Sequence, residues 1–163
     1  KGGAIGLQMF YRKVQGTVRN TTIVGNVAGV AGQKSLGGAV YTECDTQKGF
    51  AMINCILVDN TTVNSDSDAV LRLGDYAGGV DYCLFDRDSD KIGANSKVGD
   101  PKFRNPARND WRLRRASPLV DAGRDVDFTD PATDLLGNPR RVQGVLDIGC
   151  YENPCGGMTI YVR

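Results

Sequence analysis

The chain has 163 residues, a formal net charge of +1 and 40% hydrophobic residues. This length suits one domain, and the balanced charge gives no sign of nucleic-acid binding or of attachment to a membrane surface. No apolar run approaches the roughly 20 residues that a membrane-spanning helix needs, and the 21 glycines favour tight turns over long helices.

The first part of the chain repeats one pattern three times. The copies read TVRNTTIVGN from residue 17, AMINCILVDN from residue 51 and GVDYCLFDRD from residue 79. A second element, KGGAI at the start and LGGAV from residue 36, precedes the first two copies, and a weaker DAV at 68–70 precedes the third. Alignment of the copies puts their apolar residues into common columns: Val18 with Met52 and Val80, Thr22 with Ile56 and Leu84, and Ile23 with Leu57 and Phe85.

A period of about 30 residues predicts a stack of similar coils. A unit this small cannot bury its own apolar side, but stacking gives a continuous core and pairs each strand with the equivalent strand of the next coil. The strands would then be parallel, and the fold all-β. The columns that begin at Thr22 and Ile23 are neighbours, so a straight strand cannot point both inward. Either the chain bends there or one column packs outside.

Asparagines recur in two further columns, Asn20 with Asn54 and Asn26 with Asn60. Such residues can occupy turns in the left-handed conformation, or they can form a buried ladder in which each amide bonds the next. We favour turns for Asn26 and Asn60. For Asn20 and Asn54 the ladder is the alternative to a turn.

The character of the chain changes after Gly99. Two prolines follow, and the segment DWRLR at 110–114 then alternates, with Trp111 and Leu113 predicted on the face opposite Arg112 and Arg114. We interpret residues 1–99 as three coils and residues 100–163 as a C-terminal cap and tail that close the open end of the stack. Because the chain begins at residue 1 inside a repeat, we expect it to be part of a longer or processed protein, in which case the missing signal peptide indicates no compartment.

These motifs carry two resemblances. The GGAI and GGAV elements with their N-x-x-I/L-x-x-N units resemble polymorphic outer-membrane proteins and other bacterial right-handed parallel β-helix proteins of the pectate-lyase superfold. The motifs DPKF, DWRL, SPLVDAG, DLLGNPR and DIGCYE, which begin at residues 100, 110, 117, 134 and 147, follow the order seen in the choice-of-anchor Q family. The resemblance implies a right-handed parallel β-helix (solenoid) with a C-terminal cap, in a secreted or cell-surface bacterial protein. It implies no reaction.

Catalytic residues are not evident in the sequence. Parallel β-helix lyases act on acidic polysaccharides with a Lys or Arg base and often calcium, and this chain has no histidine and no compact group of basic residues on aligned columns. Arg72 lies in the third coil and could face a groove. We therefore expect no catalytic site, and a polysaccharide lyase or hydrolase is the alternative.

The region 104–115 combines five arginines with Trp111. An aromatic ring flanked by guanidinium groups can hold an acidic sugar, whereas a buried Trp111 with surface arginines would be structural. The candidates for glycan contact are Trp111, Arg112, Arg114 and Arg72.

An acidic cluster follows in the cap. Calcium takes six to eight oxygen ligands, so calcium is the one cofactor that the sequence suggests. Leu136 replaces the acid that the resembling family commonly has in the D-L-x-G-N turn, which weakens this role. The alternative is a solvated loop whose carboxylates pair with Arg124, Arg140 and Arg141. The candidate ligands are Asp121, Asp125, Asp127, Asp130 and Asp134.

The five cysteines fit no zinc pattern. Cys150 and Cys155 bracket a proline-containing turn and are the disulfide candidates for an oxidising compartment. Cys55 and Cys83 share a column, and we interpret them as small buried residues between which a bridge is sterically allowed but not required.

Together these features predict a non-catalytic scaffold, adhesin or glycan-contacting surface with a polysaccharide as partner. The exposed edge of the first coil raises a further alternative, end-to-end self-association into filaments.

Overall fold

The computed structural model describes residues 4–9, 16–33, 36–44, 50–63, 71–72, 77–88, 92–126, 132–142 and 144–154. Among these residues the regular structure is β-strand, apart from one 3₁₀ turn, and no helix is long and apolar enough to cross a membrane. The elements are β1 (Ile5–Met9), β2 (Gly16–Arg19), β3 (Thr22–Val24), β4 (Val27–Ala28), β5 (Val40–Cys44), β6 (Phe50–Ile53), β7 (Ile56–Val58), β8 (Thr61–Thr62), β9 (Leu71–Arg72), β10 (Ala77–Asp81), β11 (Leu84–Phe85), β12 (Lys97–Val98), β13 (Phe103–Asn105), η1 (Pro106–Arg108) and β14 (Asp110–Leu113).

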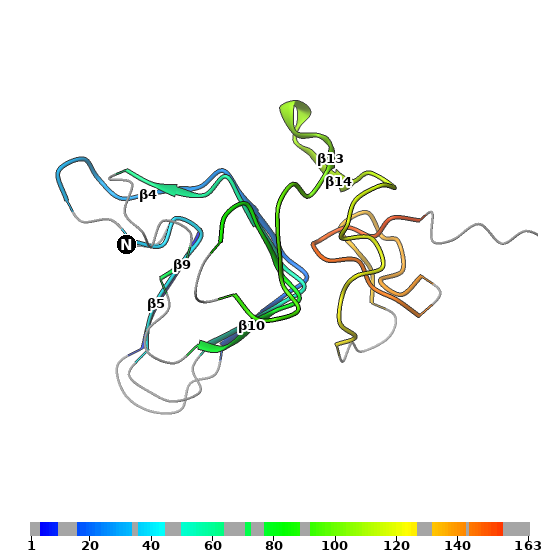
Figure 1. Ribbon diagram of the computed structural model, residues 1–163, viewed down its shortest axis with the longest axis horizontal. Coiled ribbons are helices and arrows are strands. Elements are labelled where there is room, and N and C mark those ends of the chain that lie inside the picture. Colours follow the sequence, from blue (N-terminus) through cyan, green and yellow to red (C-terminus); the bar gives the residue numbers. More distant parts are fainter. Residues whose placement is uncertain are drawn as a thin grey trace, which may run out of the picture.

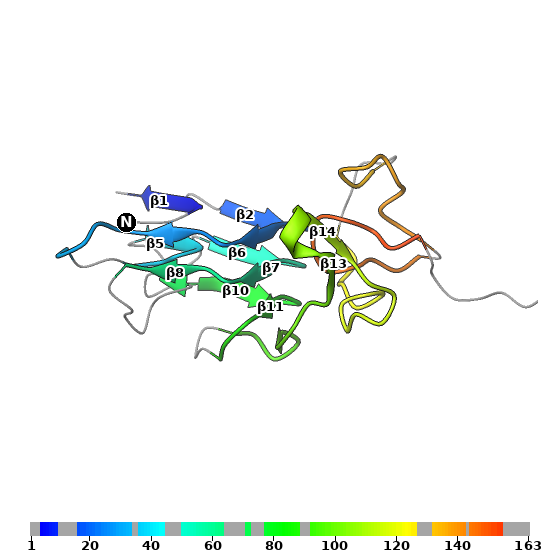
Figure 2. The same ribbon diagram turned by 90° about the horizontal axis from the view of Figure 1, so that it is seen from above.

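The fold is all-β with parallel sheets. Four parallel sheets have the orders β1-β5-β9, β2-β6-β10, β3-β7-β11-β12 and β4-β8, and β13 pairs with β14 in an antiparallel hairpin. Equivalent strands of successive repeats overlie one another in Figure 1 and lie side by side in Figure 2. Three of these sheets take one strand from each repeat, whereas β4-β8 takes strands from the first two repeats only, so strands about 30 residues apart in sequence become neighbours.

The register of these sheets confirms the predicted columns. Val18 pairs with Met52, and Met52 pairs with Val80. The next columns continue in the same register: Thr22 with Ile56 and Leu84, and Ile23 with Leu57 and Phe85.

The two neighbouring columns face different cores. Leu57 and Phe85 are buried in an inner cluster together with Met52 and Val80. Ile56 and Leu84 point to the other side of the same short strands and belong to a second cluster. The sequence left two possibilities, a bend in the chain or a column that packs outside. The structure shows the column that packs outside, because successive side chains of a strand point to opposite faces.

The C-terminal segment covers this outer column. Phe103, Leu113, Leu119 and Ile148 pack against Ile56, Leu84 and Val58 in the second cluster. Figure 1 shows the segment beside the stacked strands. This position differs from the expected closure of the open end, because burial of the outer apolar column requires a partner at the side of the stack.

Residues 93–99 occupy the edge formed by β10 and β11. The backbone N–H groups of Gly93, Lys97 and Gly99 donate to the carbonyl oxygens of Val80, Cys83 and Phe85, at 2.7, 2.7 and 2.8 Å. These bonds satisfy backbone groups that an edge strand would otherwise leave unpaired.

Close backbone approach joins the C-terminal segment to the stack. The Gly149 N–H donates to the Asn54 carbonyl at 2.9 Å, and Gly149 has a φ of +110°. A Cβ there would lie 2.7 Å from Cδ1 of Ile56, so both the conformation and the packing require glycine.

Both asparagine columns form side-chain ladders. The Asn54 Nδ2 donates to Oδ1 of Asn20 at 3.0 Å, and both residues also adopt the left-handed conformation, so the turn and the ladder coexist in this column. The Asn26 Nδ2 donates to Oδ1 of Asn60 at 2.9 Å.

The prediction that Asn26 and Asn60 serve as left-handed turn residues is therefore wrong. The positive φ angles belong to the preceding residues, Gly25 and Asp59. Asn60 is fully buried, and its Nδ2 also donates to the carbonyl of Ile23 at 2.8 Å. Because a buried amide needs hydrogen-bond partners, Asn26 and Asn60 serve as ladder residues and not as turn residues.

Candidate functional site

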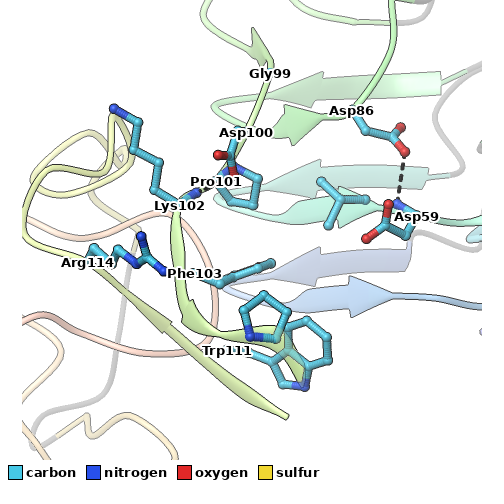
Figure 3. Close-up of a pocket in the computed structure, with 11 residues that line it drawn as sticks. Asp59, Asp86, Gly99, Asp100, Pro101, Lys102, Phe103, Trp111 and Arg114 are labelled. Carbon is cyan, nitrogen blue, oxygen red and sulfur yellow. Dashed lines mark hydrogen bonds between the residues drawn. The ribbon is translucent and has the colours of Figure 1, made fainter. Parts of the chain in front are cut away.

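An open cavity of about 560 Å³, here called the junction groove, lies where the C-terminal segment meets the ends of β7 and β11 (Figure 3). Its apolar wall is made of side chains from both parts of the molecule. They are Val58, Pro101, Phe103, Pro106 and Trp111.

Trp111 is half-buried in this wall. Its ring packs edge-on against Phe103, with centroids 5.2 Å apart and an interplanar angle of 77°. Pro106 opens η1 and Asn109 ends it in the left-handed conformation with φ 57°, which folds β14 back along β13. Trp111 also lines a second cavity of about 390 Å³. The residue is thus both part of the core and part of an open surface.

Charged groups surround the apolar wall. In Figure 3 Asp59 and Asp86 lie on one side and Lys102 and Arg114 on the other, while Asp100 lies between them, next to Lys102. The sequence predicted guanidinium groups near Trp111, and the structure adds carboxylates that line the same groove.

Three contacts fix the acidic side. The Asp59 N–H donates to Oδ2 of Asp86 at 2.8 Å, and Arg87 bonds both oxygens of Asp86 at 3.2 Å. No described residue donates a hydrogen bond to the carboxylate of Asp59, which is exposed. The Lys102 N–H donates to Asp100 at 2.7 Å. The Asp59 carboxylate is therefore available to a ligand.

The four candidates for glycan contact do not come together. Arg114 lines the groove with Trp111, and its Nη2 donates to the Arg104 carbonyl at 3.1 Å. Arg112 instead forms two 2.7 Å hydrogen bonds with Asp110. Arg72 lies in β9, on a different sheet from the strands that border the groove, and its side chain is outside the described part of the chain.

The Asp110–Arg112 pair is electrostatically self-contained. The hydrogen bond from Arg112 lowers the pKa of Asp110 to about 2, and the same bond raises the pKa of Arg112. Because each charge already has its counter-ion, Arg112 is a weaker candidate for an acidic sugar than Arg114.

Asp134 is a buried turn-capping residue. Its Oδ1 accepts from the N–H groups of Leu136 and Asn138 at 2.8 Å, and its Oδ2 accepts from Asn138 Nδ2 and from the Glu152 N–H at 3.0 Å. Burial works against ionisation of Asp134, but the hydrogen bonds from Asn138, Glu152 and Leu136 outweigh it and lower the pKa. The carboxylate is saturated by the protein itself.

The other acidic candidates are dispersed. Asp125 pairs with Arg141 at 2.7 Å, as the solvated-loop alternative predicts. Asp121 is exposed, with a φ of 53°. Asp127 and Asp130 lie outside the described residues. In the described ranges no three Cys, Asp or Glu side chains gather as a metal site. The calcium site stays a prediction about a loop that is described only in part.

The structure contains a buried charged cluster that the sequence did not indicate. Arg140 contacts Glu152 through Nη2 and Oε1 at 3.0 Å, and both side chains are at most 4% exposed. The Asp147 N–H donates to Glu152, and Asp147 in turn accepts from the N–H groups of Asp121 and Asn153 at 2.8 and 2.6 Å. This network ties the turns of the C-terminal segment to one another.

Burial dominates the protonation of this cluster. It raises the pKa of Glu152 to about 8, although the positive charge of Arg140 acts in the opposite direction. Burial also raises the pKa of Asp147, against the hydrogen bonds that it accepts. The cluster is therefore a pH-sensitive part of the structure.

The proposed disulfide partners are only partly described. Cys150 is half-buried and its thiol is free. Its backbone N–H donates a hydrogen bond to Oγ1 of Thr22 at 3.2 Å, and burial raises the pKa of the thiol. Cys155 lies outside the described residues, so a Cys150–Cys155 bond stays a prediction.

Sequence reasoning missed most of the charged groups of the groove. A signal was available for two of them, because Asp59 and Asp86 each closely follow an apolar pair of the repeat. Asp100 and Lys102 gave no comparable signal, since only the packing of the C-terminal segment brings them to the same opening.

Comparison with known proteins adds no assignment to this geometry. Neither a protein-family model, nor a curated protein, nor a solved structure matches the chain.

Proposed function

We propose that this chain is a right-handed parallel β-helix with a C-terminal cap and that it acts as a non-catalytic scaffold with a glycan-contacting surface. Three observations support the fold: parallel sheets, a register that repeats about every 30 residues, and one strand per repeat in three of the four parallel sheets. Crossovers between parallel strands are right-handed in about 98% of cases. In this proposal residues 1–99 form the coils, and residues 100–163 form a cap that packs on the side of the stack rather than over its end.

The junction groove carries the functional part of the proposal. Its volume of about 560 Å³ lies in the range of small-ligand sites. Trp111 and the prolines offer apolar surface to the ring face of a sugar, and carboxylates can accept hydrogen bonds from sugar hydroxyl groups. The groove opens on a stack of paired strands, which gives it a rigid base.

The charges favour a neutral saccharide over an acidic one. Asp59 and Asp100 would repel a uronate and are balanced by Arg114 and Lys102, while Asp86 is already paired with Arg87, so the groove has no surplus positive charge to select an acidic sugar. The arginine-rich segment by itself suggested an acidic polysaccharide, which is now the alternative to a neutral saccharide as ligand.

The location follows as a further proposal. The motifs of the repeats and of the C-terminal segment resemble those of secreted and cell-surface bacterial proteins, and a glycan-binding scaffold suits that setting. Detection of the native protein in surface or culture fractions of its source cell, rather than in the cytosol, would agree with it.

A glycan array with neutral and acidic saccharides, followed by titration calorimetry, tests the function. The wild type should bind a neutral glycan, and Asp59→Asn should weaken binding about tenfold, equivalent to about 1.4 kcal/mol. Asparagine tolerates the left-handed conformation of Asp59, so this change removes the charge with little strain.

The control is Arg112→Ala, which removes a charge next to Trp111 in sequence but outside the groove. Equal losses in both variants would contradict the groove as the binding site. Binding to no glycan would contradict the function itself.

The enzyme alternative predicts a different result. A lyase would generate ultraviolet absorbance from uronate polysaccharides, and loss of this signal in Lys102→Ala or Arg114→Ala would identify the base. Absence of any increase would leave the scaffold proposal standing.

The edge made by β1, β2, β3 and β4 favours a second candidate, self-association. Each of these strands is the last in its sheet, and edge strands can pair with another chain. Size measured by light scattering should then rise with protein concentration.

A further inference from the structure

Cys55 and Cys83 occupy the same position in adjacent repeats. Each follows a residue in the left-handed conformation, Asn54 with φ 56° and Tyr82 with φ 52°. Each precedes a strand, and the first residues of these strands, Ile56 and Leu84, are register partners. The two cysteines are therefore stacked directly, one coil apart.

The two cysteines lie together in the inner core. Both residues are fully buried, and the Cys55 N–H lies 3.4 Å from Sγ of Cys83. The hydrogen bond between the two thiols, together with burial, raises the pKa of Cys83. The same hydrogen bond lowers the pKa of Cys55, so Cys55 is the thiol of the pair that ionises more readily.

The same geometry suits a covalent bond. Neighbouring strands lie about 4.8 Å apart, within the roughly 4.4–6.8 Å between Cα atoms that disulfides span. Both side chains belong to one packed cluster, so bond formation requires no large movement of either strand.

We propose that Cys55 and Cys83 form an intramolecular disulfide when the protein folds in an oxidising compartment. The inference is independent of glycan binding. The structure shows the reduced form, in which both thiols are free.

The reaction uses a low-molecular-weight disulfide such as oxidised glutathione as oxidant. One cysteine thiolate attacks that disulfide, forms a mixed disulfide and releases one glutathione thiolate. The second cysteine thiolate then attacks the protein-bound sulfur, forms the Cys55–Cys83 bond and releases the second glutathione thiolate. The protein loses two protons and two electrons, and the oxidant becomes two thiols.

Burial determines when this happens. The folded core excludes the oxidant, so the bond forms while the strands are still assembling. Once formed, it is equally shielded from reductants. It closes a loop between residues 28 apart in the chain and joins the second repeat to the third, which restricts the unfolded state.

Peptide mapping of the wild-type protein tests the proposal directly. Cleavage after Lys48, Arg72 and Arg87 places the two cysteines in separate peptides, 49–72 and 73–87, and Cys44 in a third. After refolding with reduced and oxidised glutathione, alkylation and digestion without reductant, we expect 49–72 linked to 73–87. Recovery of both peptides alkylated, or linked elsewhere, would overturn the proposal.

A variant comparison gives a second readout. In Cys44→Ser/Cys150→Ser/Cys155→Ser, oxidative refolding should remove two free thiols, and the melting temperature should rise by several degrees over the reduced form. Addition of Cys83→Ser should abolish both effects and leave at most a glutathione adduct. A disulfide that forms but lowers the melting temperature would show that the stacked geometry does not suit the bond.

Discussion

The stacked repeats and the C-terminal segment satisfy their buried polar groups in different ways. In the stack, Asn54 and Asn60 bond the equivalent asparagine of the preceding repeat. In the C-terminal segment, Arg140, Asp147 and Glu152 form a charged network held by individual backbone N–H groups, although Nε and Nη1 of Arg140 have no hydrogen-bond partner among the described residues. A neutral amide can bond its own copy because the backbone repeats, whereas a non-repeating segment must supply a different partner for each group.

The largest expected effects come from two neighbouring residues that face different regions. Phe85→Ala empties the inner core of the stack, and Leu84→Ala empties the contact with the C-terminal segment. Each should cost about 2–5 kcal/mol of unfolding free energy. Trp111, the only tryptophan, packs in the outer cluster and reports on that contact by fluorescence.

Urea unfolding followed by circular dichroism and by fluorescence separates the two regions. In Leu84→Ala the fluorescence transition should precede the circular dichroism transition, because the C-terminal segment detaches first. In Phe85→Ala the two transitions should coincide. Identical behaviour of both variants would mean that the two cores unfold as one unit.

A somewhat smaller effect is expected at the residue that links the two regions. The Asn54 side chain bonds Asn20 and both the N–H and the carbonyl of Arg124. Asn54→Ala leaves these groups without partners and places alanine, which tolerates the left-handed conformation less well than asparagine, at φ 56°; together these changes should cost about 3 kcal/mol. Chemical denaturation measures the loss.

The control at this position is Asn54→Gly. Glycine adopts a positive φ freely, so it removes the hydrogen bonds without the backbone strain. We expect Asn54→Gly to be less destabilised than Asn54→Ala. If Asn54→Gly were as stable as the wild type, the side-chain bonds would contribute nothing.

The charged network predicts a moderate dependence of stability on pH. Burial raises the pKa of Glu152 from 4.5 to about 8 in the folded protein, so the folded state binds this proton more tightly than the unfolded state. The contribution is complete below pH 4.5 and is lost as the pH rises through 8, with a slope of at most about 1.4 kcal/mol per pH unit.

Denaturation of wild type and Glu152→Gln at pH 5, 6, 7 and 8 measures this slope. The chain has no histidine whose titration would obscure this range. Stability of the wild type should fall with rising pH, and the variant should show a flatter profile. A wild type that becomes more stable with pH would show that Arg140 keeps Glu152 ionised.

The smallest effect is expected for the exposed ion pair of the hairpin. Arg112→Ala removes the partner of Asp110, but both side chains reach solvent, and exposed pairs contribute little. The melting temperature should stay nearly constant at low and high salt. A clear drop at low salt alone would indicate that Arg104 and Arg114 take part in a larger network.

The columns of the stack could be predicted from the sequence because each repeat constrains the next. Val18, Met52 and Val80 lie in register as expected, and so do the columns that begin at Thr22 and Ile23. The role of Asn60 could not be predicted, because an asparagine that recurs in a turn and one that recurs in a ladder give the same sequence pattern.

The groove could be predicted only in part. The alternation at 110–114 predicted Trp111 on the face opposite Arg114, yet both residues line the groove, and the alternation gave no position for Asp59 or Asp86 relative to them. Those carboxylates come from repeats that lie 25 or more residues earlier in the chain, and only the packing of Phe103 and Leu113 on Ile56 and Leu84 brings them near.

The sequence by itself determined which residues stack, since a periodic pattern of apolar side chains can bury itself only by laying one repeat on another. Tertiary structure alone decided which face the C-terminal segment covers and which charges it carries to the groove. The physical reason is that the repeats interact with their own kind at a fixed spacing, whereas the non-repeating segment is positioned by contacts between residues far apart in the chain, for which the sequence contains no period.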